Sequence, residues 1–277
     1  MSAPAELPES QATGAIAAIF AELRHLTGVG YVSSIFRHLA TMPGMLEWAW
    51  DGLGPAFRAG AIQTAGGAIA AGAALAPPPA LDAARLAGWG VDAAALGAIR
   101  SAAAGFVRVA PGNLVAGACL APLLAGRAAA GPGFAPGWTP PAPLPPVPPT
   151  ADPAAQAAPV RALLDRLATV DGAVRFVPGL YRQLAHWPGL LEWLAETLPP
   201  RLAAPDAQAT MAGLRAAAAK AAAPILAALP AAPPAPLDPA GCTGVLAAVA
   251  RYGRTSPELT LAGRYLSAAL GPVPPGG

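Results

Sequence analysis

Two pairs of charged residues recur at matching places in the chain and could carry chemistry. Arg37 and Arg182 form one pair, and Glu47 and Glu192 form the other. Two neighbouring carboxylates can share acid and base roles, and two guanidinium groups can bind a carboxylate. Each glutamate follows a proline by four residues, near a helix start whose dipole favours negative charge. We therefore interpret the glutamates as structural. The arginines are interpreted as ion-pair partners of these glutamates or as helix caps, with carboxylate binding as their alternative role.

The other side chains that often carry catalysis are scattered. They are His25, His38, His186, Cys119, Cys242, Ser33 and Ser34. No HxxH, HExxH or CxxC spacing joins them, which argues against a metal site, a redox pair and a disulfide framework. The two adjacent serines lack the GxSxG turn of a serine hydrolase. The sequence therefore predicts no metal and no cofactor.

The composition excludes several classes of protein. Charged residues make up 12% of the 277 positions, and the net charge of +2 gives no basic surface for nucleic acid or anionic lipid. So few charges also argue against a coiled coil and a polar disordered chain. The first residues do not resemble a signal peptide, and the uncharged stretch 59–76 is typical of a packed internal helix. We expect a cytoplasmic protein that binds neither nucleic acid nor membrane.

The strongest signal in the chain is an internal repeat. The stretch at 31–55, YVSSIFRHLATMPGMLEWAWDGLGP, recurs without gaps 145 residues later as FVPGLYRQLAHWPGLLEWLAETLPP, with 11 of 25 positions identical. Residues 19–26 also resemble 163–170. A match this dense indicates that the chain contains two similar halves.

Two further positions extend the repeat towards the end of each half. Phe106 lies five residues before Pro111, as Tyr252 lies five before Pro257. Between the halves, a proline-rich segment is expected to be extended and partly polyproline-like. The predicted domains are a helical repeat over 1–130, a linker over 131–160 and a second helical repeat over 161–277.

Both halves are expected to be helical, because no long window alternates apolar and polar residues as strands do. Pro43 and Pro188 suit the first turn of a helix that follows a sharp corner. Pro111 and Pro257 are expected to open the last helix of each half. Further helices are predicted over 59–75, 94–107, 206–229 and 241–252. The predicted fold class is all-α, with two tandem helical repeats that form an internal pseudo-dimer.

The duplicated L-A-x-x-P-G-x-L-E corner, followed in each half by a second helix that an x-P turn introduces, resembles the group I 2-haloacid dehalogenases. This family is also known as the halocarboxylic acid dehydrogenase family. The resemblance covers nearly the whole chain apart from the linker and the termini. It implies two helical repeats around a shared pocket and hydrolysis of 2-halo carboxylic acids without a cofactor. In that reaction, a carboxylate deprotonates a water that displaces the halide directly.

The family's polar catalytic residues are not retained at the matching positions. The water-activating aspartate of the family follows a serine, and these two positions are Leu180 and Gly179 here. The water-positioning asparagine corresponds to Ala110. Asp171 is the nearest substitute acid, and we interpret it as a turn residue before Gly172. The resemblance therefore implies a divergent member with a degenerate active site.

Part of the pocket wall is retained by the same resemblance. The positions that it assigns to the pocket are Tyr31, Ser34, Ala110, Gly179, Leu180, Tyr252, Ser256 and Leu259. We also expect Phe176 to face the pocket, and the tryptophans near the corners to lie in the core.

Two functional hypotheses follow. The first is hydrolysis of a small halogenated carboxylic acid by a base that the sequence does not identify. The second is a non-catalytic helical protein that binds a small apolar acid or a protein partner. The low charge content favours helix faces buried beyond one chain, so we also expect a homodimer.

Overall fold

Helices make up most of the chain, which confirms the predicted all-α class. The computed structural model describes residues 5–126, 131–171, 174–231 and 234–271. In the first half the α-helices are α1 (Gly14–Thr27), α2 (Ser34–Leu39), α3 (Met45–Arg58), α4 (Ala61–Ala71), α5 (Ala83–Gly88) and α6 (Ala93–Leu124). In the second half they are α7 (Ala158–Arg166), α8 (Gly179–Leu184), α9 (Pro188–Leu202), α10 (Pro205–Ala228) and α11 (Pro239–Leu270).

Short elements complete the described chain. Two 3-10 turns cover Glu9–Gln11 and Pro153–Ala155. The strands β1 (Thr169–Asp171) and β2 (Val174–Phe176) pair antiparallel, with Thr169 opposite Phe176. Sequence analysis did not predict this hairpin, because each strand has only three residues. Asp171 is the last residue of β1.

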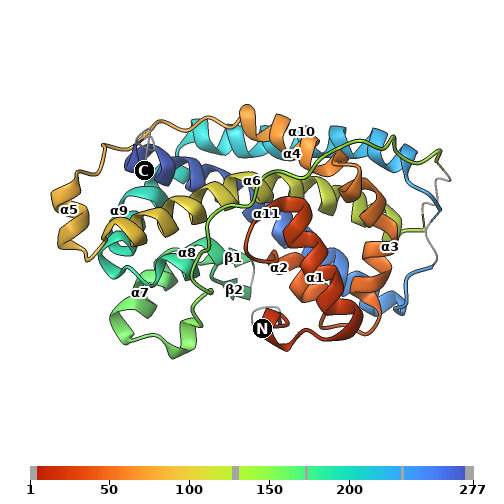
Figure 1. Ribbon diagram of the computed structural model, residues 1–277, viewed down its shortest axis with the longest axis horizontal. Coiled ribbons are helices and arrows are strands. Elements are labelled where there is room, and N and C mark those ends of the chain that lie inside the picture. The colour runs from red at the N-terminus through yellow and green to blue at the C-terminus, as the bar shows by residue number, and fades with distance from the viewer. Residues whose placement is uncertain (1–4, 127–130, 172–173, 232–233, 272–277) are drawn as a thin grey trace.

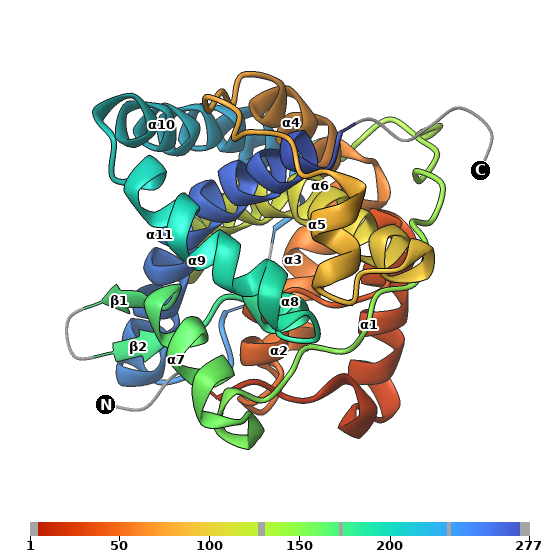
Figure 2. The same ribbon diagram turned by 90° about the vertical axis from the view of Figure 1, so that its left-hand side faces the viewer.

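The two longest helices run through the middle of the molecule. Figure 1 shows α6 and α11 crossing the centre, with α1 to α3 on one side and α7 to α9 on the other. Helices α4 and α10 lie together along one edge and pack on α6. Figure 2 shows α5 of the first half close to α9 of the second, and a hydrogen bond from Leu81 N–H, just before α5, to Ala269 O of α11 also joins the two halves.

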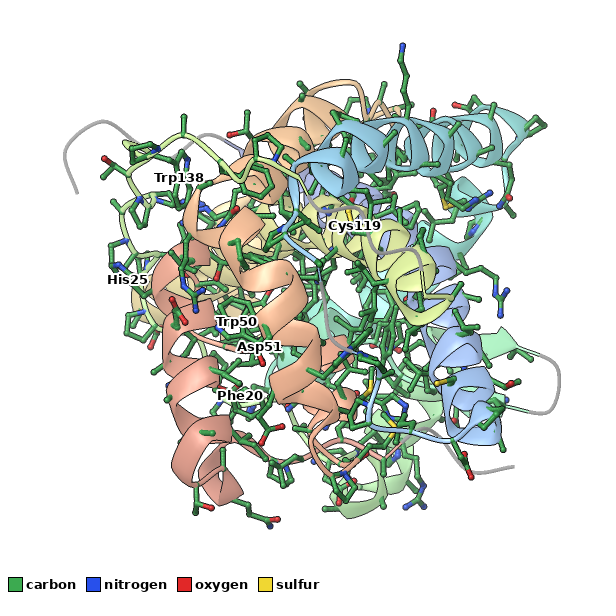
Figure 3. All side chains as sticks on the ribbon, turned by 90° about the vertical axis from the view of Figure 1, so that its right-hand side faces the viewer. Phe20, His25, Trp50, Asp51, Cys119 and Trp138 are labelled. Carbon is green, nitrogen blue, oxygen red and sulfur yellow. The ribbon has the colours of Figure 1, made fainter. Side chains whose placement is uncertain are left out.

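Two apolar cores share these long helices. The first core lies among α1, α3, α4 and α10, and includes Phe20, Trp48 and Trp50 (Figure 3). The second core lies among α5, α7, α8 and α9, and includes Trp193. Trp48 and Trp193 are each 5% exposed on the helix that follows a corner. Because α6 and α11 each contribute to both cores, they hold the two sets of helices together.

Both long helices continue through a proline. Pro111 lies inside α6 and Pro257 lies inside α11, so the prediction that these prolines open a last helix is wrong. A proline inside a helix removes one backbone hydrogen bond. Buried apolar side chains before and after each proline keep the helix in one piece. Pro43 also differs from the prediction, because α3 begins at Met45, whereas α9 does begin at Pro188.

Small residues let the central helices approach closely. A methyl group added to Gly66 of α4 would lie 2.7 Å from the backbone nitrogen of Gly112 in α6. One added to Gly263 of α11 would lie 2.8 Å from the carbonyl oxygen of Ala103. Glycine is therefore needed at both crossings.

The proline-rich segment between the halves packs along the molecule. Residues 131–152 contain no helix or strand. Leu144 N–H donates to Gly28 O at 2.8 Å, and Ala151 N–H donates to Arg182 O at 3.1 Å. The extended segment is shorter than the predicted 131–160, because α7 already begins at Ala158 with a proline in its first turn.

Two helices of the described chain are long and apolar enough to cross a membrane by length and composition. They are α6 and α10, and 61% of the most apolar stretch of α6 is buried inside the protein. A core helix of this kind passes the same test.

Candidate functional site

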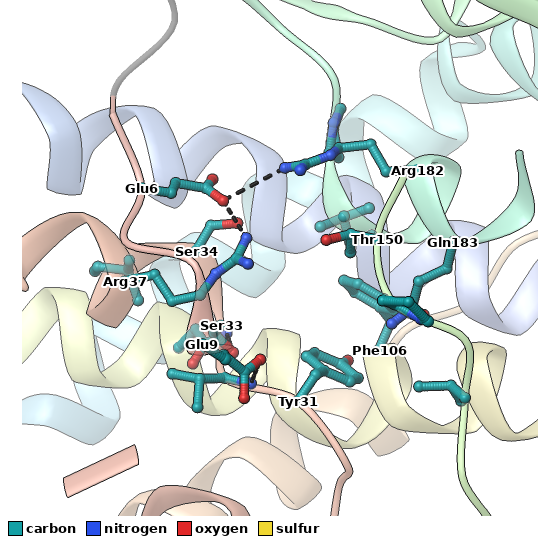
Figure 4. Close-up of a pocket in the computed structure, with 18 of the residues that line it drawn as sticks. Glu6, Glu9, Tyr31, Ser33, Ser34, Arg37, Phe106, Thr150, Arg182 and Gln183 are labelled. Carbon is teal, nitrogen blue, oxygen red and sulfur yellow. Dashed lines mark hydrogen bonds and ion pairs between the residues drawn. The ribbon is translucent and has the colours of Figure 1, made fainter. Parts of the chain in front are cut away.

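A cavity of about 690 Å³ lies where the two sets of helices meet. Its walls come from α2 and α8, from the middle of α6 and from α11 (Figure 4). The N-terminal segment, residues 5–12, and the linker residues 147–150 also border it. Six separate segments of the chain therefore have to come together to form this pocket.

Two aromatic pairs form opposite parts of the pocket wall. Tyr31, just before α2, stacks on Phe106 of α6 with ring centres 5.1 Å apart. Phe176, at the end of β2, meets Tyr252 of α11 edge to face at 6.3 Å. Such walls suit the apolar part of a small ligand.

Four buried polar atoms of the pocket residues have no hydrogen-bond partner in the described part of the chain. They are the hydroxyl oxygens of Tyr31 and Tyr252, the Oε1 atom of Gln183 and the Nε atom of Arg37. Burial raises the pKa of both tyrosines, and the nearby Glu6 carboxylate raises that of Tyr252 further. Both hydroxyls therefore stay protonated and can donate. Leaving a buried polar group unpaired costs about 1–3 kcal/mol, so these atoms indicate a place for a polar ligand.

The matched arginines converge on a carboxylate from the N-terminal segment. Arg37 Nη2 donates to Glu6 Oε2, and Arg182 Nη1 lies 3.4 Å from the same oxygen. Arg182 also donates through Nε to Ala151 O at 2.9 Å. The predicted pairing of these arginines with Glu47 and Glu192 is wrong. The N-terminal segment folds back, so that both arginines contact Glu6 and not these two glutamates.

The other carboxylates at the pocket already accept hydrogen bonds. Glu9 accepts from Arg24 Nη1 at 2.6 Å and from Val32 N–H at 2.8 Å, one bond on each oxygen. Asp152 accepts from Ala154 N–H at 3.0 Å and caps a short helical turn. Each of these acids therefore makes a structural contact, and both oxygens of Glu9 accept a hydrogen bond.

Seven of the eight residues that the resemblance assigned to the pocket line this cavity. From the first half these are Tyr31, Ser34 and Ala110, and from the second half they are Gly179, Tyr252, Ser256 and Leu259. Leu180 does not line it, because its side chain is 0% exposed in the second core. The next residue towards the N-terminus, Gly179, faces the pocket and lies against Phe106.

Sequence analysis missed several polar residues of the pocket, which include Asn113, Gln183 and Glu6. Asn113 lies one helical turn after Ala110 on α6 and donates to Ser33 Oγ at 2.9 Å. The signal that could have found it is this spacing of three residues, which places both side chains on one face of the helix. Glu6 lies outside the repeat, and no pattern in the sequence points to it.

No three histidine, cysteine, aspartate or glutamate side chains gather into a possible metal site within the described residues. Cys119 is buried, which raises the pKa of its thiol to about 12. A thiol of this kind stays protonated at neutral pH and is a poor nucleophile.

Comparison with known proteins identifies the fold. No protein-family model matches the sequence, and no curated protein matches it. The structure is similar to that of a D-2-haloacid dehalogenase mutant in complex with D-2-CPA, with a TM-score of 0.77 and 20% identity over 96% of each chain.

Two further solved structures are similar to the same extent. One is a D-2-haloacid dehalogenase with L-LA, with a TM-score of 0.76 and 21% identity over 96% of this chain and 95% of that one. The other is a D-2-haloacid dehalogenase mutant, with a TM-score of 0.76 and 21% identity over 94% of each chain. The protein therefore has a dehalogenase-like, all-helical fold.

Proposed function

We propose that the pocket between the two halves binds a small 2-substituted carboxylic acid. The observation that carries the proposal is the pair of unpartnered, buried tyrosine hydroxyls in an aromatic cavity. A hydroxyl that donates to a ligand oxygen gains the hydrogen bond that the protein does not supply. The aromatic rings of Phe106 and Phe176 cover the apolar part of the ligand.

The charges around the pocket favour an anion. Arg37 and Arg182 bring two positive charges to its border, and Glu6 neutralises one of them. The fold supports the same class of ligand, because the similar solved structures are D-2-haloacid dehalogenases, one of them in complex with D-2-CPA. A small acid with an apolar 2-substituent satisfies the hydroxyls, the aromatic rings and the net positive charge together.

A calorimetric titration with 2-chloropropionate tests the proposal. The protein is expected to bind it saturably, and the double variant Tyr31→Phe/Tyr252→Phe is expected to bind at least about tenfold more weakly, because a hydrogen bond contributes roughly 0.5–1.5 kcal/mol. Each substitution removes one oxygen and keeps the ring. Equal binding by both proteins, or no binding by the natural chain, would count against the proposal.

Hydrolysis of such an acid is the second candidate, and the dehalogenase-like fold favours it. The pocket carboxylates Glu6, Glu9 and Asp152 are all engaged by other groups. We therefore expect the acid to be bound and not hydrolysed. Chloride release from 2-chloropropionate distinguishes the two functions, with boiled protein as the control. Release well above this control would establish hydrolysis and show that one of these acids becomes free when the ligand binds.

In the same proposal, the two halves form the domains predicted from the sequence, and the protein is cytoplasmic. It forms a homodimer through its apolar helix faces. Sedimentation of the purified protein checks the dimer, because a single species with the mass of one chain would contradict it.

A further inference from the structure

The carboxylate of Glu6 lies between two arginines at the border of the pocket (Figure 4). The arginines come from matching positions in the two halves, Arg37 in α2 and Arg182 in α8. Both contact the same oxygen, Oε2. The protein thus places one of its own carboxylates where the two halves meet.

The charges of this cluster are only partly balanced. The side chains of Arg37, Arg182 and Glu6 are 10%, 20% and 16% exposed. A buried guanidinium needs an opposite charge close by, and one carboxylate serves two guanidinium groups here. In addition, the Nε atom of Arg37 is buried and has no hydrogen-bond partner among the described residues. The cluster therefore has room for a further acceptor, and a carboxylate fits a guanidinium group with two oxygens.

Glu6 is held by a segment that can move away without disturbing a helix. It precedes the 3-10 turn Glu9–Gln11 and lies outside the α-helices. The backbone of this part bonds to α2 through Leu7 N–H and Arg37 O at 3.0 Å. Glu9 anchors the same segment separately, through Arg24 and Val32 N–H.

We propose that Arg37 and Arg182 are the receptor for the carboxylate of the ligand, and that Glu6 is a tethered competitor that occupies it when the pocket is empty. The identity of the ligand rests on the proposed function. An acid that enters the pocket takes the place of Glu6 on the two arginines. The N-terminal segment then leaves the border of the pocket, so that binding and displacement of this segment are coupled.

The first test compares Glu6→Gln with Glu9→Gln. Glu6→Gln removes the competing charge, whereas Glu9→Gln loosens the same segment and leaves Glu6 on the arginines. Glu6→Gln is expected to lower the Kd of 2-chloropropionate about tenfold, a gain of about 1.4 kcal/mol. It is expected to leave the Kd of the uncharged 2-chloropropionamide within about twofold. Glu9→Gln is expected to lower neither of these two Kd values. The proposal would be overturned if Glu6→Gln lowered the Kd of the acid and of the amide equally. It would also be overturned if Glu6→Gln and Glu9→Gln lowered the Kd of the acid equally.

The second test separates this proposal from the proposed function. Acetate, at constant ionic strength, is titrated into the natural chain and into Glu6→Gln, and binding is followed by hydrogen exchange of the Leu7 amide and by calorimetry. Acetate is expected to bind Glu6→Gln more tightly and to increase exchange at Leu7 in the natural chain. Adding Arg182→Gln to Glu6→Gln is expected to abolish the gain.

The outcomes of the two tests are distinct. If acetate binds in this way and 2-chloropropionate does not bind at all, the proposed ligand is wrong and the arginine receptor stands. If 2-chloropropionate binds the natural chain but neither acid binds Glu6→Gln more tightly, the receptor is wrong and the proposed function stands. If no carboxylate binds Glu6→Gln, both are wrong.

Discussion

The two halves of the pocket wall each use one aromatic pair, but they place the hydroxyl group on opposite partners and pack the rings differently. In the first half Tyr31 stacks on Phe106, and in the second half Phe176 meets Tyr252. Tyr31 matches Phe176 in the sequence repeat, and Phe106 matches Tyr252. Each half therefore supplies one tyrosine and one phenylalanine, in reversed order. The two halves share an aromatic pair at matching positions, while the ring geometry and the positions of the hydroxyl groups differ.

A second difference lies just behind the wall. In the second half Tyr181 donates to Glu258 Oε1 at 2.8 Å. The matching positions of the first half are Phe36, which is 3% exposed, and Gly112. The second half thus contains a partly buried polar pair where the first half is apolar. These two differences show that matching helices of the two halves can carry different polar side chains at single positions.

The largest expected effect concerns the core position next to the pocket. Leu180→Asp is expected to destabilise the protein by at least about 3 kcal/mol, because it places an unpaired carboxylate in the second core. Leu180→Met is the control and is expected to cost less than about 1.5 kcal/mol. Urea unfolding measures both. A stable, fully folded Leu180→Asp protein would mean that this position faces the pocket, as the family resemblance implies.

The close helix crossings are expected to give the next largest effect. Gly66→Ala should destabilise by about 1–3 kcal/mol, because the added methyl group meets the backbone of α6. Gly67→Ala on the exposed face of α4 should instead stabilise by about 0.5–1 kcal/mol. Gly263→Ala tests whether the crossing of α11 with α6 is equally tight. Thermal unfolding of the three variants shows whether each substitution raises or lowers the stability. Equal effects of Gly66→Ala and Gly67→Ala would contradict the close packing of α4 on α6.

The single tyrosine variants sharpen the comparison of the two wall pairs. Tyr31→Phe and Tyr252→Phe should each weaken binding of 2-chloropropionate several-fold, as expected for one lost hydrogen bond. In the absence of ligand each should leave stability unchanged or raise it by up to about 1 kcal/mol, because a buried unpaired hydroxyl is removed. Calorimetry and urea unfolding measure the two effects. A loss of stability in the unliganded variants would show that the hydroxyls have protein partners.

The smallest expected effect concerns the polar pair behind the wall. Burial raises the pKa of Glu258 in the folded protein. The folded state therefore binds the proton more tightly than the unfolded chain, and stability falls as the pH rises from about 4.5 through the folded pKa. Glu258→Gln removes this dependence and should be the more stable protein near pH 7. Unfolding curves at several pH values check the prediction, and parallel pH profiles of the two proteins would contradict it.

The helical class could be predicted from the sequence because it follows from local patterns, whereas most residues that line the pocket were expected from the family resemblance. Proline stops, apolar spacing and the repeat located most helices. The prediction failed at Pro111 and Pro257, where burial on both sides outweighs one lost hydrogen bond. The hairpin was too short to show a pattern of alternating residues.

Other parts of the site depend on contacts that no local pattern encodes. Glu6 reaches Arg37 across 31 positions and Arg182 across 176, and it lies outside the repeat. The placement of Gly179 in the pocket and Leu180 in the core depends on how α8 is turned, which the family resemblance alone did not fix.

A crystal structure of the protein with 2-chloropropionate tests the central claim most directly. The acid is expected in the cavity between α2 and α8, within hydrogen-bond distance of a tyrosine hydroxyl, with its chloromethine carbon against the aromatic rings. An acid bound in another cavity, or a pocket that stays empty at saturating concentration while both hydroxyls remain unpaired, would contradict the claim.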